Sequence, residues 1–325
     1  MSRQPLRLAV LEAERMLADA GVASPRTDAE VLAAHVLGIE RGRLPLVPLV
    51  DPPVVEALRK LVTERARRVP LQHLTGSAAV GGIEVAVGPG VFVPRPETEL
   101  LLAWGLELLE GINSPLVIDL CTGSGALALA VAHARPDAEV HAVESDQAAL
   151  SWARRNADTL ADSGDTAIWL HYGDVSDTAL LTKFDGMADL VLCNPPYVPL
   201  SAQVAPEVAR HDPHLAVFAG PDGLAVIPDV VRTGVRLLRE GGGIAIEHDD
   251  SHGEAVPGLL AQRRVLTDVA DHADLAGRPR YATARRRVAD ASTLQAGLST
   301  DASTLQAGLS TDASTLQAGL RPASR

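Results

Sequence analysis

The sequence is poor in cysteine and in aromatic residues. Its 325 residues include two cysteines, Cys121 and Cys193, which is too few for a disulfide scaffold or a four-cysteine zinc site. Aromatic residues make up 3% of the chain, so the core must be built mainly from Ala, Val and Leu. We expect both cysteines to be small core residues and not a redox pair.

The sequence also lacks an excess of basic residues and any long apolar run. The formal net charge is -12, whereas nucleic-acid binding usually depends on Lys and Arg that neutralise phosphates. The N-terminal residues lack the apolar core of a signal peptide, and no stretch of about 18 uncharged apolar residues occurs. We therefore expect a cytoplasmic protein with no membrane contact and no direct nucleic-acid partner. We also expect a monomer.

The remaining composition is that of a globular protein, with 46% hydrophobic and 22% charged residues. Because single cores usually stop growing near about 250 to 300 residues, the length favours one large domain and a smaller one. We predict four segments: a helical domain (1–75), a β-hairpin linker (76–96), a large domain (97–288) and a tail (289–325).

The first segment has apolar residues at helical spacing from Leu6 to about Val69. Thr27-Asp28 is a candidate cap for the second helix, and Gly38 is a candidate stop. After Gly76 the pattern changes to alternation. Ile83, Val85 and Val87, then Gly88-Pro89-Gly90, then Val91 and Val93, together predict the hairpin.

From residue 115 onward, short Val/Ile/Leu runs alternate with helical segments. Strands alternating with helices in this way indicate βαβ units and a parallel sheet covered on both faces. We therefore predict an α/β fold with a doubly wound, seven-stranded, Rossmann-like sheet. Its predicted strands are 116–120, 139–143, 168–171, 189–193, 243–247, 265–269 and 281–288.

The tail contains three near-perfect copies of D-A-S-T-L-Q-A-G-L-S-T, which begin at Asp290, Asp301 and Asp312. An eleven-residue period is compatible with a helix. Gly and several Ser and Thr residues lower the helix propensity of every copy, so we expect a poorly ordered tail without chemistry.

A glycine-bearing turn, Cys121 to Gly125, follows the predicted strand that contains Asp119 and leads into an Ala-rich helix. Gly123 and Gly125 allow the backbone to pass close to a ligand, where a Cβ would clash. The third glycine of the G-x-G-x-x-G dinucleotide motif is absent. Taken alone, the turn is equally compatible with a plain strand-to-helix connection.

Acidic residues end the next two predicted strands. Glu144 lies about 20 residues after the turn, where a carboxylate can accept both hydroxyls of a ribose. Asp174 ends the following strand, where it could meet an adenine amino group. The alternatives are a solvated acid for Glu144 and a capping residue for Asp174.

The fourth predicted strand ends in Asn194-Pro195-Pro196-Tyr197. Two successive prolines cannot continue a ladder, so the chain is rigid at the carboxyl edge of the sheet, where open α/β folds bind ligands. An amide nitrogen is a poor nucleophile. If the Asn194 side-chain oxygen and the Pro195 carbonyl each accept one of its hydrogens, it gains electron density and orientation. Tyr197 could stack on the planar group.

These motifs, in this order, resemble the class I S-adenosylmethionine-dependent methyltransferases, and N-P-P-Y narrows the resemblance to enzymes that act on nitrogen attached to a planar carbon. Pro94-Arg95-Pro96-Glu97-Thr98-Glu99 is similar to the P-R-P-x-T-E sequence of the release-factor glutamine methyltransferases, the HemK or PrmC family. Pro70-Leu71-Gln72-His73 precedes it at the place of that family's P-x-Q-Y stretch, with His73 in place of the usual Tyr.

The resemblance covers residues 6 to 288 and implies transfer of a methyl group from S-adenosylmethionine to the side-chain nitrogen of the glutamine in the G-G-Q motif of peptide chain release factors. It implies that the helical domain helps to hold the release factor. The implied cofactor-binding residues are Asp119, Cys121, Thr122, Gly123, Ser124, Gly125, Glu144, Asp174, Val175 and Asn194. The implied catalytic residues are Asn194, Pro195, Pro196 and Tyr197, which also bind substrate together with Arg95 and Glu97.

Three alternatives remain open at the level of sequence. A glutamine methyltransferase acting on a ribosomal protein and an adenine-N6 nucleic-acid methyltransferase would use the same N-P-P-Y chemistry. A non-catalytic binding module would keep only the fold. His248 and His252 form an H-x-x-x-H pattern, but no third ligand is obvious, so we expect solvated loop histidines and no metal.

Overall fold

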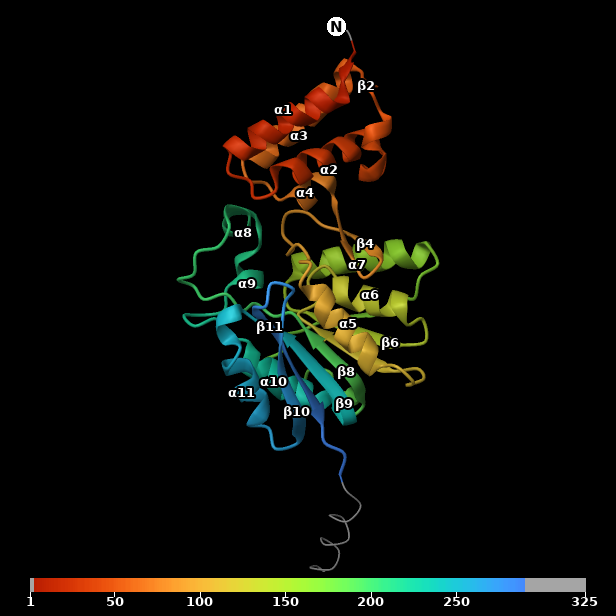
Figure 1. Ribbon diagram of the computed structural model, residues 1–325. Coiled ribbons are helices and arrows are strands. Elements are labelled where there is room, and N and C mark those ends of the chain that lie inside the picture. Colours follow the sequence, from red (N-terminus) through yellow and green to blue (C-terminus); the bar gives the residue numbers. More distant parts are fainter. Residues whose placement is uncertain (1–2, 290–325) are drawn as a thin grey trace, which may run out of the picture. The chain divides into compact units, whose positions relative to one another are not determined.

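The computed structural model describes residues 3–289 of the chain (Figure 1). The chain divides into a compact unit, Met1–Arg286, and a second unit, Arg287–Arg325. The repeats that begin at Asp290, which we expect to be poorly ordered, lie outside the described residues. Within the described part, no helix combines the length and the apolar character needed to cross a membrane.

The N-terminal region is helical, and Leu17, Leu32, Leu58 and Val62 are buried in its core. Gly38 ends the second helix in a left-handed conformation, with a φ of 63°, which confirms the predicted stop. The predicted cap is wrong, because the helix begins earlier, at Pro25, a residue favoured in the first turn. The elements are β1 (Gln4–Pro5), α1 (Leu6–Asp19), α2 (Pro25–Leu37), η1 (Arg41–Leu46), β2 (Leu49–Val50), α3 (Pro52–Ala66) and α4 (Leu71–Thr75).

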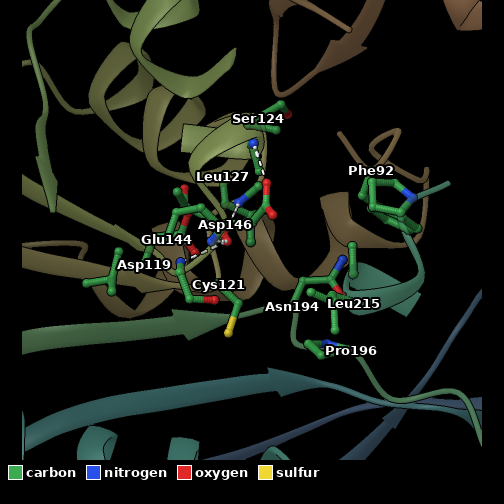
Figure 2. Close-up of a pocket in the computed structure, with 18 of the residues that line it drawn as sticks. Phe92, Asp119, Cys121, Ser124, Leu127, Glu144, Asp146, Asn194, Pro196 and Leu215 are labelled. Carbon is green, nitrogen blue, oxygen red and sulfur yellow. Dashed lines mark hydrogen bonds between the residues drawn. The ribbon is translucent and has the colours of Figure 1, made fainter. Parts of the chain in front are cut away.

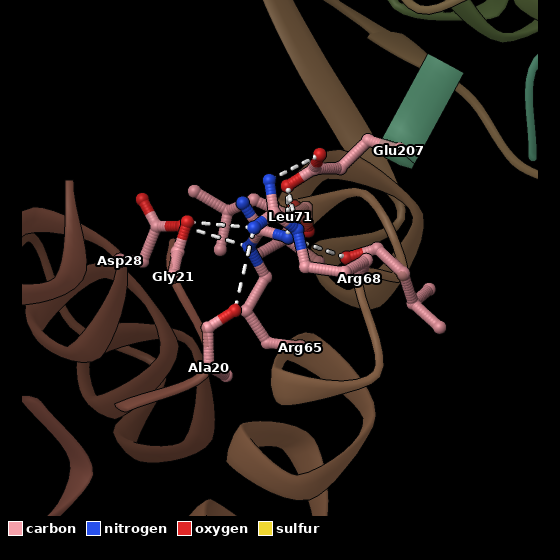
Figure 3. A network of polar contacts seen from close by, with 9 residues as sticks. Ala20, Gly21, Asp28, Arg65, Arg68, Leu71 and Glu207 are labelled. Atoms are coloured by element: carbon pink, nitrogen blue, oxygen red, sulfur yellow. Dashed lines mark hydrogen bonds and ion pairs between the residues drawn. The ribbon is translucent and has the colours of Figure 1, made fainter. Parts of the chain in front are cut away.

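Asp28 lies in the first turn of α2 and is part of a buried ionic network (Figure 3). Arg65 of α3 contacts both Asp28 Oδ2, at 2.7 Å, and Glu207 Oε1, at 2.8 Å. Arg68 contacts Glu207 Oε2 at 2.7 Å. Two guanidinium groups thus pair with two carboxylates. Buried charges require such pairing, because an unpaired buried charge is strongly destabilising. The network fastens α8 (Pro206–His211) to the end of α3.

A β-hairpin follows the helical region, formed by β3 (Ser77–Val80) and β4 (Ile83–Ala86). Its turn is Gly81-Gly82, and both residues have a positive φ, as a tight two-residue turn requires. The predicted turn at Gly88-Pro89-Gly90, with a second strand at 91–93, is therefore wrong. A Cβ on Gly81 would lie 2.7 Å from the Ala130 Cβ, so only glycine fits this turn against α6 (Ala126–Ala134).

The larger region contains one seven-stranded sheet in the order β10-β11-β9-β8-β5-β6-β7. Neighbouring strands from β9 to β7 are parallel, and β11 pairs antiparallel with both β9 and β10. The predicted α/β fold and strand number are confirmed. The strands are β5 (Leu116–Leu120), β6 (Glu139–Glu144), β7 (Trp169–Tyr172), β8 (Ala188–Cys193), β9 (Leu238–Glu247), β10 (Leu266–Ala273) and β11 (Pro279–Arg286).

Helices cover both faces of the sheet (Figure 1). Successive residues of β5 point to opposite faces: Val117 packs in the core beneath α5 and α6, and Ile118 packs in the core beneath α10 and α11. This explains why the strand is apolar almost throughout. The helices are α5 (Thr98–Leu108), α7 (Gln147–Asp162), α9 (His214–Val217), α10 (Ile227–Leu237) and α11 (Ala255–Ala261), with short turns η2 (Thr182–Phe184) and η3 (Asp250–His252).

The order of strands reverses at β5, whose neighbours are β6 on one side and β8 on the other. Leu120 is paired with Val143 of β6 and with Cys193 of β8. The residues that follow these three, including Glu144 and Asn194, therefore emerge side by side at the carboxyl edge. Open α/β sheets bind ligands at this reversal point.

Candidate active site

A cavity of about 330 Å³ opens at the reversal point of the sheet (Figure 2). Its walls come from the turns after β5, β6, β7 and β8, together with residues 90–94 and 213–216. Ten of the residues predicted from the sequence line it: Asp119, Cys121, Thr122, Gly123, Ser124, Glu144, Asp174, Val175, Asn194 and Pro196. Five predicted residues of the described chain are absent from its lining: Gly125, Pro195, Tyr197, Arg95 and Glu97.

The glycine turn has alternating left-handed residues. Cys121, Gly123 and Gly125 have φ values of 59°, 59° and 84°. Such a φ is strained for Cys121, and backbone strain of this kind clusters at functional sites. Gly125 does not line the cavity. It contributes to the turn as a glycine, because a Cβ there would lie 3.1 Å from the Leu129 Cδ1.

Glu144, at the end of the neighbouring strand β6, accepts hydrogen bonds that stabilise this turn. Its Oε2 accepts a hydrogen bond from the Gly123 amide at 2.8 Å, and its Oε1 accepts from the Ser145 and Asp146 amides, both at 2.9 Å. Burial raises the pKa of Glu144, and these three hydrogen bonds oppose the rise. A carboxylate has about four acceptor positions, so one position remains for a ligand hydroxyl.

Asp119 is buried at the floor of the cavity with one oxygen unsatisfied. Its Oδ2 accepts a hydrogen bond from the Thr122 hydroxyl at 2.5 Å, whereas Oδ1 has no partner within residues 3–289. Burial raises the pKa of Asp119 to about 7, and the Thr122 hydroxyl and the nearby Ala128 backbone amide oppose the rise. A buried, unpaired acceptor is costly, so this oxygen is suited to a cationic N–H donor of a ligand.

Asp174 and Val175 form the wall after β7. Asp174 Oδ1 accepts a hydrogen bond from the Ser176 amide at 2.7 Å, which lowers the pKa of Asp174. This is the capping contact considered as the alternative role, yet Asp174 also lines the cavity. Val175 is buried and adds apolar surface beside it. An acceptor next to an apolar wall suits a heterocyclic base.

Asn194 presents a free side-chain oxygen. Its Nδ2 donates a hydrogen bond to the Thr98 Oγ1 at 3.2 Å. In the described part of the chain, neither Asn194 Oδ1 nor the Pro195 carbonyl oxygen forms a hydrogen bond. Asn194 and Pro196 line the cavity, and Pro195 between them is buried. The segment Asn194-Pro195-Pro196, which we call the Asn194 corner, therefore has two oxygen atoms that accept no hydrogen bond from the described residues. One of them, Asn194 Oδ1, belongs to a cavity-lining residue.

Tyr197 lies outside the cavity lining and packs against the core beneath α10. Its hydroxyl donates a hydrogen bond to Glu247 Oε1 at 2.9 Å. Burial and the neighbouring Glu247 raise the pKa of Tyr197, so its hydroxyl keeps its proton. In this position Tyr197 supports Glu247, instead of presenting its ring to a ligand as we expected from the sequence.

Arg95 and Glu97 also support the cavity from outside. The Arg95 guanidinium lies 4.9 Å from the centre of the Phe92 ring and donates a hydrogen bond to Asp212 Oδ2 at 2.6 Å. Burial raises the pKa of Asp212 to about 6, and Arg95 opposes the rise. Arg95 thus connects the wall that contains Phe92 with the wall at 213–216. Glu97 lies 4.0 Å from Arg278.

The sequence did not single out four further lining residues: Phe92, Thr98, Pro213 and Leu215. Phe92 stands between two fully buried valines, Val91 and Val93, so alternation could have placed its ring on the opposite face. Leu215 has a relative exposure of 76%, and its sequence context gives no comparable indication.

The expectation that His248 and His252 are solvated is wrong, because both are buried. His248 hydrogen-bonds to Asp271 Oδ1 and to the Asp249 carbonyl, and His252 to the Asp222 carbonyl. These contacts make them structural. Among the described residues, no group of three or more His, Cys, Asp or Glu side chains is arranged to hold a metal ion.

Both cysteines are free thiols. Cys193 is buried in the core, whereas Cys121 lines the cavity. Burial, followed by the contact with Cys121, raises the pKa of the Cys193 thiol. Cys193 therefore stays protonated and unreactive.

Comparison with known proteins identifies the family. The family described as the PrmC N-terminal domain matches residues 9–76, and the methyltransferase small domain matches residues 86–211. The release factor glutamine methyltransferase of Mycolicibacterium smegmatis is 50% identical over 281 residues, covering 86% of this chain and 98% of that protein. The chain belongs to the release factor glutamine methyltransferase family. The protein of the same name from Streptomyces coelicolor is 48% identical over 284 residues, covering 85% and 96%.

A solved release-factor-specific protein-(glutamine-N5) methyltransferase from Alicyclobacillus acidocaldarius is 26% identical, covering 62% of this chain and 99% of that one, with a TM-score of 0.37. At that score the superposition adds nothing to the assignment, which depends on the sequence relatives.

Members of this family use S-adenosylmethionine, and the cavity fits that cofactor. The cavity presents an unpaired carboxylate oxygen on Asp119, where an ammonium group would fit, a remaining acceptor on Glu144 for a ribose hydroxyl, and an acceptor beside an apolar wall at Asp174 and Val175 for an adenine. Gly123 has no Cβ and borders open space, so a ligand could lie close to its backbone. The fit depends most on Asp119 Oδ1, which is buried without a hydrogen-bond partner among the described residues. Such an atom is unfavourable unless a ligand supplies the donor.

Proposed function

We propose that this enzyme transfers a methyl group from S-adenosylmethionine to the side-chain amide nitrogen of the glutamine in the G-G-Q motif of peptide chain release factors. The names of its relatives support the substrate. The free Asn194 Oδ1 at a cavity suited to the cofactor supports the chemistry and is the observation that carries the proposal.

The cofactor supplies an electrophilic methyl group on a sulfonium ion. Asp119 Oδ1 binds its ammonium, Glu144 its ribose, and Asp174 with Val175 its adenine. Thr122 orients Asp119 through their hydrogen bond. The turn from Cys121 to Gly125 borders the methionine portion. Each of these roles uses an acceptor or a surface that the cavity presents.

The substrate amide must be activated, because its nitrogen lone pair is delocalised into the carbonyl. In our proposal Asn194 Oδ1 accepts one N–H hydrogen and the Pro195 carbonyl accepts the other. This hydrogen bonding raises the electron density on nitrogen and fixes its direction. The two prolines keep the backbone of the corner rigid. After transfer, the amide nitrogen releases one proton to solvent.

The residues around the corner position it. Phe92, Pro213 and Leu215 supply an apolar rim that limits water near the amide. Arg95 holds two parts of this rim together through Phe92 and Asp212. In this proposal Arg95 acts on the substrate indirectly, by fixing the wall that the glutamine enters. Tyr197 donates a hydrogen bond to Glu247 on the core side of this site.

We further propose that the enzyme works as a cytoplasmic monomer and that residues 1–75 contact the release factor. The division into segments 1–75, 76–96, 97–288 and 289–325 is part of this proposal. The net charge of -12 supports a protein substrate over a nucleic acid, because phosphates would be repelled.

A parallel methylation assay tests the proposal. Labelled S-adenosylmethionine is offered with purified release factor, with ribosomal proteins and with DNA. We expect label on the release factor and none on a release factor whose G-G-Q glutamine is replaced by alanine. Label on DNA or ribosomal protein alone would contradict the proposal, as would cofactor binding without transfer to any substrate.

A further inference from the structure

A chain of hydrogen bonds leads from Asn194 through Thr98, both of which line the cavity, to Glu247 in the core. The Asn194 Nδ2 donates to Thr98 Oγ1 at 3.2 Å, and the Thr98 hydroxyl donates to Glu247 Oε2 at 2.8 Å. The Tyr197 hydroxyl donates to the other oxygen, Oε1, at 2.9 Å. The residues come from the start of α5, the corner after β8 and the end of β9. Thr98 is 3% exposed and Glu247 1% exposed, so water has little access to the hydrogen bond between them.

The order of donors and acceptors in this chain is fixed by Glu247. A carboxylate accepts hydrogen bonds and donates none, and each hydroxyl has a single hydrogen. Thr98 gives its hydrogen to Glu247, so its oxygen can act only as an acceptor towards Asn194. Burial raises the pKa of Glu247, while the hydrogen bonds from Thr98 and Tyr197 and the charge of Arg280 oppose this rise.

The direction of the chain determines which end of the Asn194 amide meets the substrate. With Nδ2 held by Thr98, Oδ1 is left for the cavity. A flipped amide would place Oδ1 against a Thr98 oxygen that has no hydrogen to offer. It would also present an NH₂ group to the NH₂ group of a glutamine, so that donor meets donor. Only the observed orientation offers an acceptor.

We propose that Thr98 and Glu247 are positioning residues that fix the orientation of the Asn194 amide, with Glu247 acting through Thr98. The inference rests on the proposed function in so far as the substrate presents N–H hydrogens to Asn194. It extends that function to two residues on different elements, separated from Asn194 by 96 and 53 positions in the sequence. Thr98 lines the cavity and Glu247 does not, and in this proposal both act on the substrate through the orientation of Asn194.

Replacing Thr98 tests the first link. The T98V variant keeps the shape of the side chain and removes the acceptor, and we expect kcat to fall roughly 10- to 100-fold, as for loss of a preorganised polar contact. The Kd and KM for S-adenosylmethionine should stay within about twofold, because Thr98 holds no cofactor-binding group in this scheme. T98S restores the hydroxyl and should recover kcat to within about threefold of wild type.

A matched control separates positioning from loss of a buried hydroxyl. Thr283 on β11 is also 3% exposed and hydrogen-bonded, to His272. T283V makes the same chemical change away from the corner and should keep kcat within about twofold. Circular dichroism and melting temperature verify that each variant is folded. If T98V fails to fold, the comparison uses T98S and E247Q.

A double-mutant cycle tests whether Glu247 acts through Thr98. E247Q removes the fixed direction of the chain, because an amide can donate to the Thr98 oxygen, and we expect kcat to fall by roughly tenfold. In the T98V background the same change should have an effect of less than about twofold. Multiplicative effects of the two changes would overturn the proposal, as would wild-type kcat in T98V or failure of T98S to restore it.

Failure of the proposed function gives a different result from failure of this inference. If wild-type enzyme does not methylate the release factor, the proposed substrate is wrong, and the cycle is run on the ribosomal protein or DNA that wild type does methylate. If wild type is active and T98V is equally active, only the positioning role of Thr98 and Glu247 is wrong.

Discussion

The buried carboxyl of Asp119 leads to a prediction in which stability and cofactor binding move in opposite directions. Replacing Asp119 with asparagine should stabilise the cofactor-free protein above about pH 7 and weaken cofactor binding. Burial raises the pKa of Asp119 to about 7 from its ordinary value of 3.8. A carboxyl whose pKa is raised by folding favours the folded state at pH values below 3.8. That advantage is lost as the pH rises through about 7.

The magnitude follows from the same two values. The difference between them corresponds to ~4 kcal/mol of folding free energy that is lost once Asp119 is fully ionised. Asparagine does not ionise, but it leaves a buried amide group without a partner at the position of Oδ1, at a cost of ~1 to 3 kcal/mol. We therefore expect a net gain of ~1 to 3 kcal/mol for D119N at pH 8, and a smaller gain or a loss at pH 6.

Urea unfolding at pH 6 and pH 8 measures the stability difference, and calorimetric titration with S-adenosylmethionine measures binding. We expect D119N to bind at least ~10-fold more weakly at pH 8, because the charge partner of the ammonium is gone. D174N is the matched control for the unfolding measurement alone, since Asp174 lines the same cavity but has a lowered pKa. A stability change that is equal at both pH values, or unaltered cofactor binding, would refute the reasoning about Asp119.

Three further predictions follow from single contacts. Asn194→Ala should reduce methyl transfer at least ~100-fold with cofactor affinity largely kept; turnover near wild type in a radiolabel assay would rule out its role. Although burial opposes ionisation, hydrogen bonds from Arg68 and Arg65 lower the pKa of Glu207 to about 2. Glu207→Gln should therefore cost ~3 kcal/mol in urea unfolding at pH 7, and this cost should shrink as the pH falls from about 4.5 towards 2; a cost independent of pH would contradict the ionic account. Gly125→Ala should lower the melting temperature more than Gly111→Ala, because both glycines have positive φ but only at Gly125 would a Cβ be crowded, 3.1 Å from the Leu129 Cδ1; equal effects would show that this crowding has no effect on stability.

Much of the larger region could be predicted from the sequence because its strands are continuous apolar runs. The predicted bounds of β5 agree with the structure, and those of β6 and β8 each differ by one residue. Acids and glycines at the ends of these strands then place the cavity, since parallel strands bring their carboxyl ends to one edge. The sequence pattern was sufficient to predict those site residues that directly follow a strand in the sequence.

The errors have physical reasons. Residues 81–90 contain two glycine pairs, and only tertiary contact decides the turn, because Gly81 must fit against Ala130. Asp28 resembles a helix cap in sequence, but its partner is Arg65, 37 residues away. Thr98 and Glu247 are 149 residues apart, so no local pattern joins them. The Tyr197 hydroxyl likewise donates to Glu247, 50 residues away, so its position in the core could not be predicted from a local pattern.

The most direct test of the central claim is a crystal structure of the enzyme with S-adenosylhomocysteine and a peptide that contains the G-G-Q motif. The account predicts that the glutamine amide nitrogen lies within hydrogen-bond distance of both Asn194 Oδ1 and the Pro195 carbonyl oxygen, on the cofactor side of the corner. A glutamine amide bound elsewhere in the cavity, or an Asn194 that turns its Nδ2 towards the substrate, would contradict it.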